Sequence, residues 1–182
     1  MSNRTHQVNQ YAYSGDDCLL FDTNIWLFLY GPQYSPDNPR VIAYSEAAKR
    51  ILAAKCHLFI DVLVLSEFVN AWARFEYNRL PGHLRARDFK AFRKSDAFTP
   101  VARDTATACR KIIGLCTPVN NGFETLNIAA LLSDYETGKL DLNDRVLASL
   151  CEDRQFKLVT DDADFYNQNV TILTANQRLL NR

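Results

Sequence analysis

Short runs of strand length alternate along this chain with longer stretches whose apolar residues recur at helical spacing. The strand-length runs are at 18–22, 56–60, 116–120, 157–162 and 170–175. The helical stretches are at 24–31, 41–54, 62–80, 123–138 and 142–155, the last with Asn143 as its N-cap, and two further helices over 84–116 meet near Thr99-Pro100. Strands that alternate with helices predict an α/β fold built on a mostly parallel sheet.

Length and composition favour one globular domain. The chain has 182 residues, of which 47% are hydrophobic and 23% charged, enough to bury a core. We expect a single domain over 1–182, with a helical insertion at about 77–105 and a flexible N-terminal tail at 1–15. No apolar run approaches the roughly 20 residues of a membrane span, and the first residues lack the apolar segment of a signal peptide. We therefore expect no membrane association and a cytoplasmic location.

The cysteines do not predict a disulfide framework. The five residues, at positions 18, 56, 109, 116 and 151, are scattered, and no pair has the close spacing of a zinc site. We interpret them as reduced core thiols.

Acidic residues fall where a parallel sheet binds ligands. Asp22 closes the first run, and the segment "TDDADF" at 160–165 closes the fourth with three carboxylates in four residues. Ligands of open parallel sheets bind outside the carboxyl ends of the strands. Like charges this close repel, and each raises the pKa of its neighbour unless a cation or donor offsets it.

Two predicted helices add one acid each. Asp144 lies on the apolar stripe at the start of the helix 142–155, and Glu67 lies at the margin of the buried face of the helix 62–80. Each also has an ordinary explanation when taken alone: an Arg salt bridge for Glu67, and helix N-terminal stabilisation for Asp144. The acids of 160–165 could equally belong to a surface turn.

The set of acids is more informative than its members. Four acids on four elements, with no His or Cys nearby in the sequence, offer hard oxygen ligands that suit Mg²⁺ or Mn²⁺ and not zinc. One or two such ions can activate a water and stabilise an in-line phosphoryl displacement.

Four short motifs carry a family resemblance. They are "FDTN" at 21–24, "LSEF" at 65–68, "NDRVLASL" at 143–150 and "LVTDDADF" at 158–165. In this order they resemble the PIN domains, which are metal-dependent ribonucleases. The resemblance implies a three-layer α/β/α fold with a five-stranded parallel sheet in the order 3-2-1-4-5.

The same resemblance implies the site. The acidic tetrad that binds metal and supports catalysis would be Asp22, Glu67, Asp144 and Asp162. Asp164 would be an additional metal-binding acid, and the supporting polar residues would be Thr23, Asn24 and Thr160. Asp161 stays open as an alternative to Asp162.

The implied activity is divalent-metal-dependent endonucleolytic hydrolysis of RNA phosphodiesters. VapC-type toxins of toxin–antitoxin pairs belong to this family, so an antitoxin protein and a second copy of the chain are expected partners. The chain is longer than those compact toxins, and the excess lies between Trp72 and Cys116.

Charge is uneven along a chain of zero net charge. Between Arg74 and Lys111 there are ten Lys or Arg and four Asp or Glu, whereas between Asp134 and Asp164 there are nine acids and four bases. Aromatic residues interleave the basic stretch, a composition that suits single-stranded nucleic acid. We expect RNA binding by Arg85, Arg87, Arg93 and Lys94, with an amphipathic helix bearing a solvated face as the alternative.

Two other functions remain open. The same fold could serve as a non-catalytic module that binds RNA or a protein. A phosphatase on a doubly wound sheet, with Asp22 as nucleophile, would usually need a second Asp two positions on, where this chain has Asn24.

Overall fold

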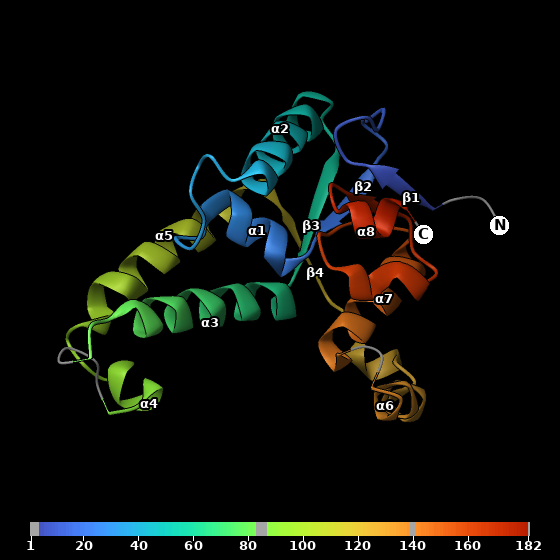
Figure 1. The fold of residues 1–182 in the computed structure, drawn as a ribbon. Coiled ribbons are helices and arrows are strands. Elements are labelled where there is room, and N and C mark those ends of the chain that lie inside the picture. The colour runs from blue at the N-terminus through green and yellow to red at the C-terminus, as the bar shows by residue number, and fades with distance from the viewer. Residues whose placement is uncertain (1–3, 83–86, 139–140, 182) are drawn as a thin grey trace.

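The computed structural model of the protein describes residues 4–82, 87–138 and 141–181. Within these ranges six strands form one sheet in which every pairing is parallel (Figure 1). The strands are β1 (Thr5–Gln7), β2 (Cys18–Phe21), β3 (His57–Asp61), β4 (Thr117–Val119), β5 (Lys157–Val159) and β6 (Ile172–Thr174). Their order across the sheet is β1-β6-β5-β2-β3-β4. The α/β class is confirmed, and the five predicted strands lie in the predicted order 3-2-1-4-5.

The described residues also form eight α-helices, which cover both faces of the sheet. They are α1 (Thr23–Tyr30), α2 (Pro39–Ala53), α3 (Val62–Arg79), α4 (Phe89–Phe92), α5 (Phe98–Leu115), α6 (Ile128–Glu136), α7 (Leu142–Arg154) and α8 (Gln177–Leu180). The chain crosses from β2 to β3 to β4 in one direction and then returns past β2 to β5. Because parallel crossovers are right-handed, the helices of the two directions lie on opposite faces, with α1, α2, α3 and α5 grouped apart from α7 (Figure 1).

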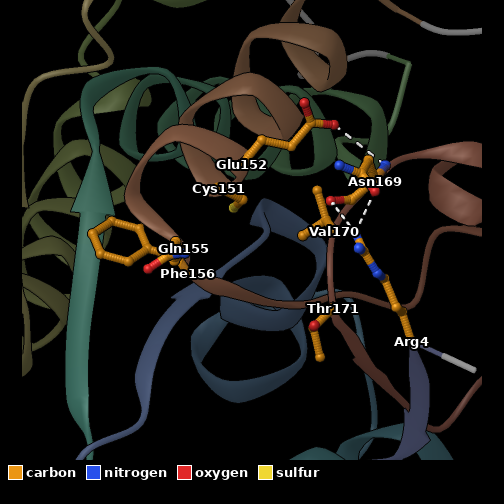
Figure 2. A pocket seen from close by; sticks show the side chains of 8 residues that line it. All are labelled: Arg4, Cys151, Glu152, Gln155, Phe156, Asn169, Val170 and Thr171. Carbon is orange, nitrogen blue, oxygen red and sulfur yellow. Dashed lines mark hydrogen bonds between the residues drawn. The ribbon is translucent and has the colours of Figure 1, made fainter. Parts of the chain in front are cut away.

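The predicted flexible tail over 1–15 is wrong for the residues that the structure describes. β1 pairs with β6 at the edge of the sheet, and Val8 is fully buried. The sequence carries no strand signal there; the strand forms because β6 offers an open row of hydrogen-bonding groups. Arg4 adds an anchor by donating to the carbonyl and side-chain oxygens of Asn169 (Figure 2).

Three helix boundaries also differ from the sequence prediction. Asp141, not Asn143, caps α7, and its carboxylate accepts the Asn143 N–H at 2.8 Å. Thr99 and Pro100 lie in the first turn of α5, where proline needs no N–H partner, so the break falls before Phe98. The predicted helix 123–138 divides into a 3₁₀ turn, η1 (Phe123–Thr125), and α6, because Asn127 caps α6.

The predicted insertion at about 77–105 covers the end of α3, all of α4 and the start of α5. Its residues 83–86 lie outside the described ranges. Whether this segment is an insertion stays a prediction.

Burial identifies β2 as the centre of the core. Leu19 and Leu20 point to opposite faces of the sheet and both are fully buried, as expected of a strand covered on two sides. All five cysteines are free thiols, with Cys151 buried and the others half-buried, in agreement with the sequence interpretation. Among the helices of the described residues, none combines the length and the apolar character of a membrane span.

The segment between β1 and β2 is fastened to the sheet by a buried ion pair. The Asp17 carboxylate, almost fully buried, receives the Lys157 ammonium and the Ser14 N–H. Burial acts to raise the pKa of Asp17, but the hydrogen bonds from Lys157 and Ser14 outweigh it and the pKa is lowered. The segment is therefore part of the folded domain.

We predict that Asp17→Asn lowers the free energy of unfolding by roughly 1–3 kcal/mol, because it leaves a partly buried ammonium without its charged partner. Asp16→Asn is the matched control, since Asp16 is exposed. Urea unfolding monitored by circular dichroism measures both. Equal midpoints for the two variants would contradict the anchoring role of Asp17.

Candidate functional site

Asp22 and Thr160 lie side by side at the carboxyl edge of the sheet. Phe21 and Val159 are the last paired residues of β2 and β5, and the Asp22 N–H donates to the Val159 carbonyl at 3.0 Å. The chain leaves β2 toward β3 and leaves β5 toward β6, on opposite sides. These strand ends therefore form the topological switch point, where open α/β sheets bind ligands.

Asp22 is buried and held by three donors. One carboxylate oxygen accepts the Thr23 N–H at 2.6 Å, which caps α1; the other accepts the Thr160 hydroxyl at 2.7 Å and the Asn24 amide. The Asn24 amide also donates to Thr160 Oγ1 at 3.2 Å. The three predicted supporting residues, Thr23, Asn24 and Thr160, thus all surround Asp22.

These donors do not fully offset the cost of burying the charge. Burial raises the pKa of Asp22 to about 6, and the charges of Glu67 and Asp162 add to the rise, while the bonds from Thr160 and Thr23 oppose it. A carboxylate whose charge is disfavoured in this way gains from a nearby cation.

Glu67 reaches the site through Thr23. The Thr23 hydroxyl donates to Glu67 Oε2 at 3.1 Å, which joins α1 to the second turn of α3. Glu67 is exposed, and within the described ranges no Lys or Arg forms an ion pair with it. The Arg salt bridge considered as its ordinary explanation is therefore not found there.

Asp144 brings α7 into the same cluster. It lies in the first turn of that helix and is half-buried. The pKa of Asp144 is raised to about 7. Burial is the largest cause, and the charges of Asp22, Asp162, Asp141 and Glu67 contribute to the same rise. All three other members of the predicted tetrad act on Asp144, so the four acids share one region of space.

The two neighbouring acids of the β5 loop have different partners. The Asp161 carboxylate is bound by two residues of α2. Arg40 Nε lies 2.8 Å from one of its oxygens, and the Tyr44 hydroxyl donates to the other at 2.9 Å. Asp162 caps the 3₁₀ turn η2 (Ala163–Asn167) by accepting the Asp164 N–H at 2.9 Å. Asp162 is also the member of this loop whose charge raises the pKa of Asp22 and Asp144.

Asp164 stands apart from the other acids. Its side chain is exposed, and it is not among the charges that act most strongly on Asp22 or Asp144. It lines a separate hollow beside η2.

The donor set suits a hard divalent cation. All four clustered side chains are carboxylates. A cation would offset both the burial and the weaker carboxylate repulsion that raise the pKa of Asp22 and Asp144. Within the described residues, however, no three acidic, His or Cys side chains are grouped closely enough to form a finished metal site. The four acids are thus neighbours without being a closed ligand set.

Sequence reasoning missed the residues that support this edge. Arg40 and Tyr44, on α2, neutralise and bind Asp161, and the Tyr44 hydroxyl also donates to the Thr160 carbonyl at 3.2 Å. Nothing in the helical pattern of 41–54 signals this contact, because it joins segments more than a hundred residues apart in the chain.

The aromatic residues of the basic segment pack between helices. Phe92 is buried and packs against Tyr77, Phe98 and Phe89, so these rings fix α4 to α3 and α5. The buried Phe92 agrees with the alternative of an amphipathic helix that packs its aromatic residues inward, and Phe89 is half-buried.

The cations of this segment remain at the surface. Arg87, Arg93 and Lys94 are exposed, and Arg85 lies outside the described residues. Their role in RNA binding stays a prediction.

A hollow of about 290 Å³ at the opposite edge of the sheet is a weaker candidate site (Figure 2). Its lining residues Arg4, Phe156 and Thr171 each precede a strand, so it faces the amino ends. Its polar groups already bond one another: Asn169 accepts from Arg4 and donates its N–H to Glu152 at 3.2 Å.

We predict that the metal-free protein becomes less stable as pH rises from about 4 to 7.5. Asp22 and Asp144 have pKa values above those of an unfolded chain, so the native state binds more protons in this window and stability falls with rising pH. Asp144→Asn should remove part of that slope and raise stability at pH 7.5, on the order of 1–3 kcal/mol. Urea unfolding with EDTA across this pH range measures the difference, with Asp153→Asn, an exposed acid of α7, as control. Parallel curves for the parent and Asp144→Asn would contradict the raised pKa of Asp144.

Comparisons with known proteins agree with this geometry. A comparison with curated proteins gave no match. Among solved structures, the fold is similar to VapBC2 from Rickettsia felis bound to a DNA fragment from its promoter, with a TM-score of 0.52 and 15% identity over 87% of this chain and 98% of that one. The family profile described as PIN domain matches residues 19–170. Because that match runs from β2 to just before β6 and takes in all four clustered acids, the protein belongs to the PIN domain family.

Proposed function

We propose that the protein is a divalent-metal-dependent endoribonuclease. The observation that carries the proposal is the meeting of Asp22, Glu67, Asp144 and Asp162, from four separate elements, at the switch point of a parallel sheet. A module that only binds RNA or protein has no need to gather four carboxylates whose repulsion costs stability. PIN domains are generally nucleases, which agrees with this reading.

Each residue of the site would have a distinct part. The four acids would hold Mg²⁺ or Mn²⁺, which when bound lowers the pKa of an attacking water and offsets charge on the phosphate. Thr160, Asn24 and Thr23 would keep the Asp22 carboxylate in one orientation through the hydrogen bonds they already donate. Tyr44 and Arg40, by holding Asp161, would leave Asp162 as the ligand of that loop.

The phosphatase alternative is less well supported. Such an enzyme usually also needs a Lys near the carboxyl end of a later strand, whereas Lys157 begins β5 and pairs with Asp17 at the amino edge of the sheet. Asn24, at the position where a phospho-aspartate enzyme usually carries its second acid, is instead a donor to Asp22.

The partners are also proposals. The structural neighbour is a VapBC complex, and by analogy we propose an antitoxin protein that holds this chain inactive. A second copy of the chain is a further expected partner.

We predict that Asp22→Asn lowers Mn²⁺-dependent cleavage of single-stranded RNA by roughly a thousandfold or more, because the amide cannot serve as an anionic ligand. Asp153→Asn should cleave at the parent's rate. Gel analysis of a labelled RNA with Mn²⁺, and with excess EDTA, measures cleavage and its metal dependence. RNA cut by Asp22→Asn as fast as by the parent would overturn the proposed role of the cluster.

We predict that changing Arg87, Arg93 and Lys94 together to Ala weakens single-stranded RNA binding and flattens its salt dependence. Each lost phosphate contact should reduce the slope of log K against log salt by about 0.7. Arg50 is unsuitable as a control because it donates to the carbonyls of Asn9 and Tyr11. Lys55, which is exposed and follows the C-cap of α2, is used instead. An unchanged slope would mean that these cations form only a solvated face.

A further inference from the structure

We propose that the hollow beside η2 binds one unstacked RNA base next to the scissile phosphate, with guanine favoured. The inference rests on the proposed ribonuclease function and names a part of the substrate that the acids do not contact. The hollow measures about 500 Å³, within the range of about 300–1,000 Å³ of small-molecule sites.

Residues that line the hollow follow closely in the chain after two of the clustered acids, Asp162 and Asp144. Asp162 caps η2, and the same turn contributes Asp164 and Tyr166 to the lining. Asp144 lies in the first turn of α7, and the next residue, Arg145, also lines the hollow. A nucleotide whose phosphate lies at the acids would therefore have its base, or that of its neighbour, at the mouth of the hollow.

The Arg145 guanidinium is already paired with other residues of the hollow. Its Nε lies 2.9 Å from Asp134 of α6, and its Nη1 donates to Gln168 Oε1 at 2.8 Å. These bonds join α6, α7 and the segment after η2 into one frame. Arg145 also lies 3.8 Å from Glu152. Since the lining carries three acids, Asp134, Glu152 and Asp164, against the single cation Arg145, a phosphate is disfavoured there and an uncharged base is not.

The remaining lining offers what base recognition uses. Tyr166 has a half-exposed ring, and aromatic rings provide stacking surfaces for unstacked bases. The exposed Asp164 carboxylate accepts hydrogen bonds only. Guanine presents two adjacent N–H donors, at N1 and N2, which one carboxylate can accept together; uracil presents one. The donor pattern thus favours guanine.

The first test is nucleoside binding to the metal-free protein, followed by NMR. Guanosine should shift the backbone amides of Asp164 and Tyr166, and uridine should bind at least several-fold more weakly. Tyr166→Ala should weaken guanosine binding roughly tenfold, whereas Tyr166→Phe keeps the ring and the binding. Tyr135→Ala is the matched control, because Tyr135 is equally exposed on α6 but does not line the hollow. An absence of guanosine-dependent shifts would overturn the proposal.

The second test is the choice of cut site in RNA with Mn²⁺ present. Uridine oligomers that carry one guanine should be cut by the parent at a fixed offset from it. Asp164→Asn should lose the preference over all-uridine RNA, while Asp153→Asn, which removes the same charge elsewhere, keeps it. A preference unchanged in Asp164→Asn and Tyr166→Ala would also overturn the proposal.

The two failures are distinguishable. If the parent cuts no RNA with any metal yet binds guanosine through Tyr166, the ribonuclease proposal fails and the base site stands. If it cuts RNA without regard to the hollow, the base site fails alone.

Discussion

The burial of Asp22 among other carboxylates is the constraint on which the functional edge of this protein depends. Burial already disfavours the Asp22 charge, and Glu67, Asp162 and Asp144 bring three more negative groups to the same region. The fold tolerates this because Thr160, Asn24 and the Thr23 N–H donate to Asp22. The buried and clustered negative charges destabilise the metal-free protein, and a bound cation would offset that destabilisation. The same charges that lower stability would therefore hold the metal of the proposed activity.

The topology of the parallel sheet brings these acids to one edge, although they lie far apart in the sequence. Asp22 directly follows β2, and Thr160 directly follows β5. The two strands are neighbours, and the chain continues from them toward opposite sides of the sheet. Helices α3 and α7 begin near the same edge, so Glu67 in the second turn of α3 and Asp144 in the first turn of α7 lie there. A difference of one position in the chain decides whether an acid belongs to the cluster. Asp161, next to Asp162, is bound instead by Arg40 and Tyr44.

Much of the fold could be predicted because it depends on local pattern. The alternation of short apolar runs with helical stretches was sufficient for the class, and five of the strands were located from it. The order of those strands came from the family resemblance, since periodicity alone does not determine which strands pair. Strand β1 escaped prediction because three residues of ordinary polarity become a strand only when the edge of β6 is available.

The sequence by itself determined the chemistry of the candidate site: hard oxygen donors, placed at a strand end and in first or second helical turns, without a competing His or Cys. It could not decide which of Asp161 and Asp162 faces the cluster, nor that Asp164 lines a separate hollow with Arg145 and Tyr166. It also could not separate ring packing from base stacking at Phe92, which the contacts of α4 with α3 and α5 decide. The physical reason is common to all three. Residue type and spacing fix what a side chain can do, whereas its partners come from segments brought together only by the packing of distant elements.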